Sequence, residues 1–260
     1  MGVLNVTPDS FSDGGRHLDP AAAIEAGRAM LAAGADIIDI GGESTRPGSA
    51  PTPPDIERHR ILPVIRALAG SGALVSIDTR NAATMQAALD AGAAIINDIS
   101  GLAFDPDAAR VVARAGCAVV LMHMRGTPAT MGSLARYDDV VADVADELAA
   151  RLAVARAAGI AADRIALDPG IGFAKAGEQN LRMLRGLPAL ARLGRPLLVG
   201  VSRKRFIGAL SGVDTAADRL AGSLAAGLFA VSRGAAILRV HDVAETVQAL
   251  HVWQALAVLS

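Results

Sequence analysis

The stretch from Asp36 to Gly48 reads DIIDIGGESTRPG and indicates how the chain folds. Its isoleucines form a short apolar run, which is typical of a strand buried on both faces in a parallel sheet. A carboxylate, Asp39, interrupts the run, and burying a carboxylate costs free energy unless a partner compensates its charge. Backbone amides in the core would meet that need, and so would a ligand at the strand end. The loop that follows favours the ligand, because its hydroxyl and guanidinium groups suit phosphate.

The same unit recurs along the chain: a short aliphatic segment ends in a polar residue, and a helical segment follows. The predicted strands cover residues 2–6, 36–40, 74–77, 94–96, 118–122, 164–167, 196–199 and 235–238. The predicted helices cover residues 20–34, 54–68, 81–91, 106–116, 137–158, 180–194, 215–234 and the residues from 242 onward. Eight alternating units in 260 residues predict an α/β fold, a (β/α)8 TIM barrel that forms a single domain over residues 1–260. An open doubly wound sheet is the alternative, but no G-x-G-x-x-G follows the first strand.

Three of the predicted strands share one register. A glycine that ends a helix stands five positions before Asp39, before Asn97 and before Arg239. These residues belong to the second, fourth and eighth strands, and the carboxyl ends of barrel strands face one mouth. The three side chains are therefore expected to converge there.

Composition excludes several classes of protein. The net charge of −1 argues against a dedicated nucleic-acid or membrane-surface partner. The single cysteine, Cys117, excludes an internal disulfide, indicates a reducing compartment and is expected in the core at the barrel bottom. No charged-then-apolar leader opens the sequence, and no apolar run approaches the ~20 residues of a spanning helix. The expectation is a soluble cytoplasmic protein.

Nearly every predicted strand ends in a polar group, and barrel enzymes build their sites at these strand ends. Carboxylate and amide groups at Asp78, Asn97 and Asp168 suit the edge of a planar heterocycle. A second set suits a phosphate: Asn5, Thr45, Arg46, Arg239 and His241. The sequence contains no G-x-S-x-G elbow, H-E-x-x-H motif or cysteine pair for a metal.

Each of these residues also has a purely structural interpretation. Asp78 has the chemistry of a helix N-cap, and Asp168 before Pro-Gly that of a turn residue. His123 at a strand end is as readily a hydrogen-bonded core histidine as a ligand. Asp98 is predicted to be structural, because strand alternation turns it away from the face that carries Asn97.

Eight motifs, in this order along the chain, resemble those of the dihydropteroate synthase family, the folate-pathway enzymes that sulfonamides target. They are NVTPDSFSDGG (5–15), GGESTRPG (41–48), SIDT (76–79), IND (96–98), LMHM (121–124), LDPGIGF (167–173), SRK (202–204) and LRVH (238–241). The resemblance implies a (β/α)8 barrel that condenses 6-hydroxymethyl-7,8-dihydropterin diphosphate with 4-aminobenzoate and releases diphosphate.

The resemblance also implies roles for individual residues. The pterin would be held by Asp78, Asn97, Met122, Asp168, Phe173 and Lys204. The diphosphate would be bound by Asn5, Asp39, Thr45, Arg46, Arg239 and His241, with Asn5 as a ligand of Mg²⁺. The aminobenzoate pocket would be formed by Phe11, Asp13, Arg46, Pro47 and Ser202. A homodimer through helices of the C-terminal half is implied as well.

Such chemistry needs no protein nucleophile if diphosphate leaves first. The catalytic set is then Asp168, Lys204, Arg239 and His241, which would stabilise the charges that develop. Two alternatives remain at this point. One is a non-catalytic pterin-binding duplicate. The other is a barrel that passes a methyl group from a folate to a corrinoid partner, although that chemistry does not need the STRPG loop or the SRK motif.

Overall fold

The computed structural model describes residues 1–7, 19–44, 49 and 52–257, and within them eight parallel strands form one sheet in chain order. The strands are β1 (Gly2–Asn5), β2 (Ile38–Gly41), β3 (Val75–Asp78), β4 (Ile95–Asp98), β5 (Ala118–Met122), β6 (Ile165–Asp168), β7 (Leu197–Val199) and β8 (Ala235–Leu238). The sheet closes on itself just after β8. Gly2 forms a parallel bridge with Val240 there, and Val3 N donates to Val240 O at 2.9 Å. The predicted (β/α)8 barrel is confirmed.

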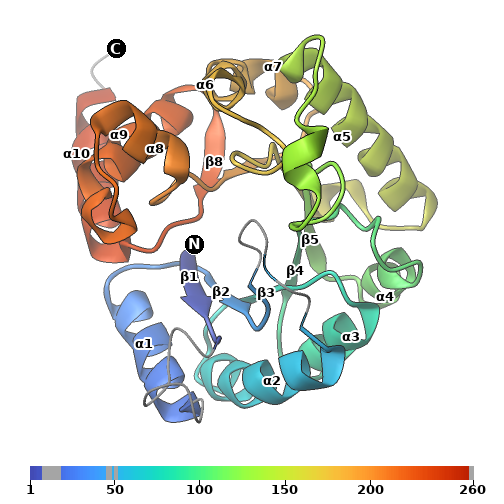
Figure 1. The fold of residues 1–260 in the computed structure, drawn as a ribbon. Helices are drawn as coiled ribbons and strands as arrows, with labels where there is room; N and C mark the ends of the chain where they lie inside the picture. Colours follow the sequence, from blue (N-terminus) through green and yellow to red (C-terminus); the bar gives the residue numbers. More distant parts are fainter. Residues whose placement is uncertain (8–18, 45–48, 50–51, 258–260) are drawn as a thin grey trace.

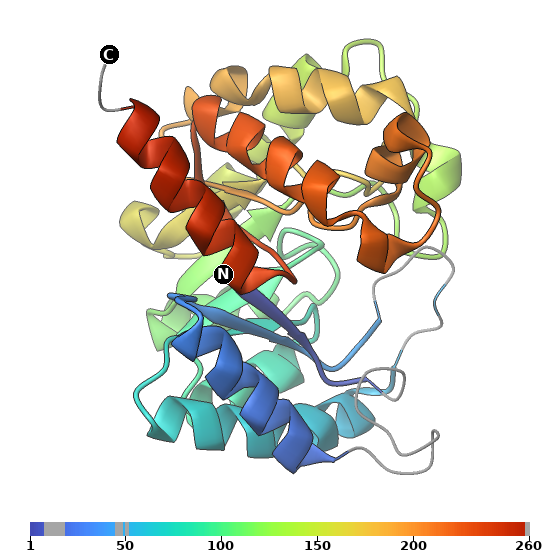
Figure 2. The same cartoon turned by 90° about the vertical axis from the view of Figure 1, so that its left-hand side faces the viewer.

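Helices form a ring around this sheet (Figure 1). They are α1 (Pro20–Ala32), α2 (Pro54–Gly70), α3 (Ala82–Asp90), α4 (Ala108–Ala115), α5 (Val140–Ala157), α6 (Glu178–Arg185), α7 (Leu187–Ala191), α8 (Arg205–Ser211), α9 (Leu220–Ser232) and α10 (Val243–Ala257). The last helix, α10, lies beside β1 in both views (Figures 1 and 2). A methyl group added to Gly2 would lie 3.1 Å from Val243 at the start of that helix. No helix among the described residues has the length and apolarity to cross a bilayer.

The barrel interior holds an apolar layer beneath the polar strand ends. Ile37, Ile95 and Ile237 stand two positions before Asp39, Asn97 and Arg239 and therefore face the same side of their strands. They belong to a small apolar cluster with Val120 and Leu198, separate from the large core between strands and helices. This layer closes the barrel from below, so the polar groups above it face one mouth.

Local signals explain where several elements begin. Asp19 caps α1, since its side chain accepts a hydrogen bond from Ala21 N at 2.8 Å and proline occupies the first helical position. Asp139 caps α5 in the same way, accepting from Val141 N and Ala142 N. The prediction that this helix begins at Tyr137 was therefore wrong by three residues.

The predicted helix over 180–194 was wrong in its continuity, and α8 was not predicted. The structure divides the 180–194 segment into α6 and α7 at Gly186, two residues before Pro188. Proline lacks the amide hydrogen that a continuous helix needs and is favoured in a first turn, so a new helix begins there. The helix α8 follows the strand-end Lys204 directly, where no break in the sequence announces it. Cys117 is free, half-buried and packed against the core, as expected.

Candidate functional site

Arg239 joins two carboxylates at the barrel mouth. Its Nε donates to Asp39 Oδ2 at 2.6 Å, and its Nη2 donates to Asp78 Oδ2 at 2.7 Å. The same Oδ2 of Asp39 accepts a hydrogen bond from Asn97 Nδ2 at 3.0 Å. The predicted convergence is therefore confirmed: Asp39, Asn97 and Arg239 meet although they come from different strands.

Burial sets the electrostatics of this cluster. Burial raises the pKa of Asp78 to about 7, although the guanidinium of Arg239 opposes that shift. Burial alone would lower the pKa of Arg239, but the charges of Asp39 and Asp78 raise it above its ordinary value. The second oxygen of Asp39, Oδ1, is buried and has no hydrogen-bond partner among the described residues. Asp39 Oδ1 can therefore accept a further hydrogen bond.

Asp168 ends β6, and Lys204 follows β7, the strand next to β8. Burial raises the pKa of Asp168, and the nearby charge of Lys204 opposes the shift. Burial lowers the pKa of Lys204 to about 8. The ammonium of Lys204 donates to Ile171 O and lies 5.0 Å from the centroid of the Phe173 ring. An acid, a cation and an aromatic face therefore lie together.

Ser202 and His241 form a polar pair beside Arg239. His241 N donates to Ser202 Oγ at 3.2 Å, and His241 Nδ1 lies 3.1 Å from the same oxygen. The pair joins the segment after β7 to the segment after β8. It is further fixed by Arg203, whose guanidinium pairs with Asp242.

The structure places further predicted residues at this mouth. Asn5 ends β1, and a methyl group added to Gly41 would lie 3.7 Å from Asn5 Oδ1 and 3.6 Å from Asp78 Cβ. Met122 ends β5 opposite Asp168 in the strand register and is buried. The remaining predicted residues lie outside the described part of the chain: Phe11, Asp13, Thr45, Arg46 and Pro47.

Structural interpretations fail for Asp78 and hold for Asp98. Asp78 does not cap a helix, because the residue that precedes α3 is Asn81. Asp98 Oδ1 accepts from Ser100 N and Ser100 Oγ, and its Oδ2 accepts from Leu102 N. Asp98 therefore fixes the turn after β4, as strand alternation predicts.

Lys175 and Glu43 are buried or strongly paired groups that sequence reasoning missed. Lys175 bonds to His123 beneath the Asp168 loop. Glu43 forms a salt bridge with Arg80 and also accepts a hydrogen bond from Thr52 N at 3.1 Å. The one sequence signal for Lys175 is that only two lysines occur in the chain.

Comparisons with known proteins agree with this geometry. The chain matches the family described as pterin binding enzyme over residues 1–241. It is 49% identical to a dihydropteroate synthase of Mycobacterium leprae over 258 residues, covering 97% of this chain and 91% of that protein. The chain belongs to the dihydropteroate synthase family. Members of this family are transferases of folate biosynthesis, so neither the open-sheet fold nor the corrinoid methyltransferase is retained.

Solved structures of dihydropteroate synthases superpose closely on the chain. One from Xanthomonas albilineans with 4-aminobenzoic acid matches with a TM-score of 0.93 at 48% identity, covering 99% of this chain and 92% of that one. Another from the same organism, in complex with 7,8-dihydropteroate, matches with a TM-score of 0.90 at 46% identity and the same coverage. The fold described above is thus that of the dihydropteroate synthases.

Proposed function

We propose that the barrel mouth binds 6-hydroxymethyl-7,8-dihydropterin diphosphate and joins it to 4-aminobenzoate, giving 7,8-dihydropteroate and diphosphate. The observation that carries this proposal is the arrangement of charge. Arg239 binds Asp39 and Asp78, and the charges of Lys204 and Arg239 both act on Asp168. A phosphate-binding cation thus adjoins a buried acidic set that suits a heterocycle. The two Xanthomonas albilineans structures, with 4-aminobenzoic acid and with 7,8-dihydropteroate, support the choice of substrates.

The pterin occupies the deeper half of this site. Its fused ring presents adjacent donors and acceptors that match carboxylate and amide groups, which here are Asp78, Asn97 and Asp168. Lys204 donates to a ring acceptor. Met122 and Phe173 give the ring apolar faces to pack against. The raised pKa of Asp78 allows this carboxyl to donate as well as accept near neutral pH.

The diphosphate lies toward the rim. Arg239 uses Nε and Nη2 for carboxylates, and its Nη1 makes no hydrogen bond to a described residue. That group and His241 are the donors proposed for the leaving phosphates, together with Thr45 and Arg46 of the second loop. Asp39 acts through Arg239, which it orients.

Mg²⁺ fits this rim as an ion held mainly by the substrate. No group of three or more His, Cys, Asp or Glu side chains among the described residues could hold a metal ion. Mg²⁺ commonly binds through one or two protein oxygens plus substrate phosphates, and the amide oxygen of Asn5 lies at the mouth. When bound, Mg²⁺ would neutralise negative charge on the diphosphate.

The aminobenzoate pocket is assigned to the outer edge of the mouth. Ser202, which contacts His241, is assigned to this pocket. The first two loops, which contain Phe11, Asp13, Arg46 and Pro47, complete the pocket in this proposal. Closing these loops over the substrates would exclude water from the reacting carbon.

The reaction follows a dissociative order. The bond between the pterin methylene carbon and the diphosphate oxygen breaks first, and the electron pair leaves with diphosphate. The carboxylate of Asp168 stabilises the cation left on the pterin, while Arg239 and His241 stabilise the leaving group. The amine of 4-aminobenzoate then attacks the methylene carbon and loses a proton to solvent. No protein nucleophile is required.

Positional isotope exchange tests this order. The substrate carries ¹⁸O at the oxygen that bridges methylene and phosphate, and it is incubated with enzyme and Mg²⁺ without 4-aminobenzoate. The label is expected to move to non-bridging positions of recovered substrate, because the released diphosphate rotates before the bond re-forms. Retention of the label, together with a secondary deuterium isotope effect near unity at the methylene during turnover, would indicate direct displacement.

We also propose that the C-terminal helices form a homodimer interface. Large hydrophobic side chains are exposed on α8, α9 and α10, namely Leu210, Phe229, Val252 and Leu256. Exposed apolar side chains grouped on neighbouring helices favour burial against a second copy. Sedimentation velocity of the protein and of a Val252→Glu, Leu256→Glu double variant tests this. A dimer that dissociates in the variant is expected, and a monomeric wild-type protein would overturn the assignment.

A further inference from the structure

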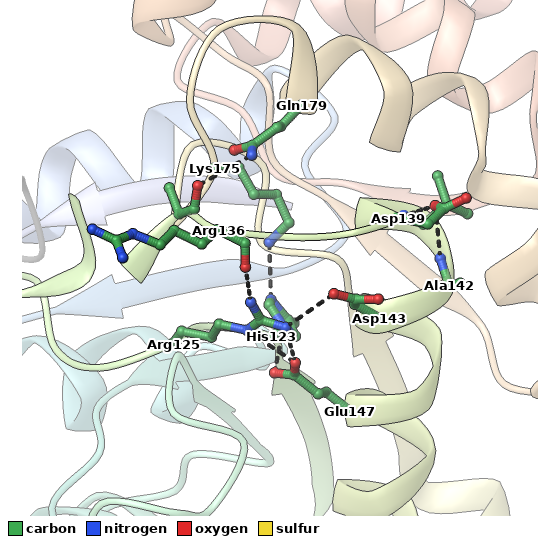
Figure 3. Close-up of polar contacts among 11 residues, drawn as sticks. His123, Arg125, Arg136, Asp139, Ala142, Asp143, Glu147, Lys175 and Gln179 are labelled. Atoms are coloured by element: carbon green, nitrogen blue, oxygen red, sulfur yellow. Dashed lines mark hydrogen bonds and ion pairs between the residues drawn. The ribbon is translucent and has the colours of Figure 1, made fainter. Parts of the chain in front are cut away.

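The ammonium of Lys175 is buried beneath the loop that follows Asp168. Only 6% of Lys175 is exposed. Its Nζ bonds to three groups: His123 Nδ1 at 2.9 Å, Gly170 O at 3.2 Å and Phe173 O at 3.2 Å. Burial lowers the pKa of Lys175 to about 7. When the group is protonated, its three partners match its three hydrogens, as a buried ammonium requires. Figure 3 shows Lys175 above His123.

The composition of the chain makes this position unusual. Of the 25 basic residues, only Lys175 and Lys204 are lysines, and the rest are arginines. Both lysines bind backbone carbonyls of the same short loop, since Lys204 donates to Ile171 O. An ammonium is compact and has three donors on a flexible stem, whereas a guanidinium is larger and holds its donors in one fixed plane.

Consecutive residues of this loop are held by hydrogen bonds to side chains. Gly170 and Phe173 bind Lys175 through their carbonyls, and Ile171 binds Lys204. Between them, Gly172 N donates to Asn180 Oδ1 at 2.7 Å. Such a number of side-chain contacts to one backbone segment fixes its conformation.

The loop needs external support because one of its non-glycine residues, Ala174, has a left-handed backbone conformation. Gly170 and Gly172 have φ angles of 66° and 81°, and Ala174 has a φ of 47°. The left-handed region is unfavourable for alanine and persists only when the surroundings enforce it. The contacts of Lys175 on either side of Ile171 and Gly172 supply that enforcement.

His123 prepares the acceptor for Lys175. Burial lowers the pKa of His123 to about 4, so the ring is neutral near pH 7. Its Nε2 lies 3.0 Å from Glu147 Oε2, and a carboxylate there selects the tautomer with hydrogen on Nε2. Nδ1 is then free to accept from Lys175. Arg125 completes the network by pairing with Glu147 and Asp143 (Figure 3).

We propose that Lys175 is a positioning residue for pterin binding. It holds the loop so that Asp168 and Phe173 keep the spacing that the heterocycle requires. Asp168 Oδ1 accepts from Gly170 N at 2.7 Å, and Gly170 O accepts from Lys175, so the carboxyl and the ammonium are linked through one peptide residue. The assignment rests on the proposed function, because it assumes that the pterin binds beside Asp168.

The test compares Lys175→Met with Leu68→Ala. Methionine keeps the length of the side chain and removes its donors, whereas Leu68→Ala loosens the core at α2, away from the site. Two quantities are measured: the Kd of the pterin diphosphate by calorimetry, and kcat/KM in the dihydropteroate assay. For Lys175→Met, kcat/KM for the pterin diphosphate is expected to fall by about a hundredfold, the typical cost of a 1 Å misplacement. The Kd is expected to rise in parallel.

A role in folding alone would give a different result. Leu68→Ala is expected to lower thermal stability while the folded enzyme keeps its Kd and KM values. Lys175→Met is also expected to leave the KM for 4-aminobenzoate, at saturating pterin, within about twofold of the wild type. If Lys175→Met loses stability but binds the pterin diphosphate as tightly as the wild type, the positioning role is overturned.

A second variant covers the case in which Lys175→Met does not fold. His123→Leu removes one of the three partners of the ammonium, and the same rise in pterin Kd is expected with a smaller amplitude. An unchanged Kd in His123→Leu would then overturn the proposal. Because the Kd is measured without turnover, failure of the wild type to form 7,8-dihydropteroate would count against the proposed function and not against the positioning role.

Discussion

Arg239 Nε lies 2.6 Å from Asp39 Oδ2 and joins the segment after the last strand to the second strand across the barrel mouth. Asp39 is fully buried, and the side chain of Arg239 is 22% exposed. A buried carboxylate that loses its cation is left without compensation, so this pair governs both stability and the geometry of the mouth.

Replacing Asp39 by Asn is expected to lower the free energy of unfolding by about 1–3 kcal/mol, because Arg239 and Asn97 lose a charged acceptor while Arg239 keeps its bond to Asp78. Urea unfolding measures the loss. The exposed Asp146→Asn on α5 is the control and is expected to stay within about 0.5 kcal/mol of the wild type. Equal stabilities of the two variants would contradict a buried pair.

The pKa of Asp78 predicts how stability depends on pH. In the folded state this pKa is raised from 3.8 to about 7, so the folded protein binds the proton more tightly than the unfolded chain. The stability contributed by Asp78 is therefore fully present below pH 3.8 and is lost as pH rises to about 7. Unfolding of the wild type and of Asp78→Asn is compared across this range. The stability of the wild type relative to the variant is expected to fall with rising pH, and a constant difference would refute the shift.

Replacing Gly170 by alanine is expected to cause a steric clash, and the same replacement at Gly116 is the control. Both Gly170 and Gly116 have left-handed φ angles, 66° and 63°. A methyl group at Gly116 would meet nothing within 4 Å, whereas at Gly170 it would lie 2.0 Å from His123 O. Gly116→Ala is expected to cost about 1–2 kcal/mol of conformational strain. Gly170→Ala is expected to cost a further 1–3 kcal/mol or so from overpacking and to weaken pterin binding. Similar costs for both variants would show that the loop can move away from His123.

Removing the buried Arg80 is expected to cost more stability than removing an exposed arginine. Its guanidinium donates through Nε and Nη2 to Glu43 and lies 4.0 Å from the centroid of the Phe104 ring. Arg80→Ala is expected to lower the free energy of unfolding by about 3–5 kcal/mol, because Glu43 is left buried. Arg110 pairs with Asp107 on the surface, and Arg110→Ala is expected to cost at most about 1 kcal/mol. Thermal or urea unfolding that ranks the two variants equally would be evidence against this.

Removing Mg²⁺ tests the proposed diphosphate half of the site independently of the pterin half. With EDTA present, diphosphate release is expected to stop, because negative charge on the leaving group is no longer neutralised. Binding of 6-hydroxymethyl-7,8-dihydropterin without diphosphate, measured by calorimetry, is expected to be unchanged. Full activity in EDTA, with the metal content verified, would remove Asn5 from the site as a metal ligand.

The sequence was sufficient for the barrel and for the convergence of strand-end residues. A strand period of two and a glycine five positions before Asp39, Asn97 and Arg239 fix the face and height of each side chain, so their meeting follows from local pattern. It was not sufficient for Lys175, whose partners include His123, more than fifty residues away in sequence. This long-range pair depends on how the segment after β5 packs against the loop after β6. A local sequence pattern does not contain that information. The break at Gly186 was missed because the helical pattern continues on both sides of it.

The proposed synthase activity is tested most directly by measuring diphosphate release from 6-hydroxymethyl-7,8-dihydropterin diphosphate with Mg²⁺ and 4-aminobenzoate. The wild type is compared with Lys204→Ala and with Arg205→Ala, an exposed neighbour on α8. In the wild type, diphosphate release coupled to formation of 7,8-dihydropteroate is expected. This activity is expected to be lost in Lys204→Ala and kept in Arg205→Ala. A folded wild-type protein that binds the pterin diphosphate but forms no 7,8-dihydropteroate would contradict the proposed activity and indicate a pterin-binding protein without catalysis.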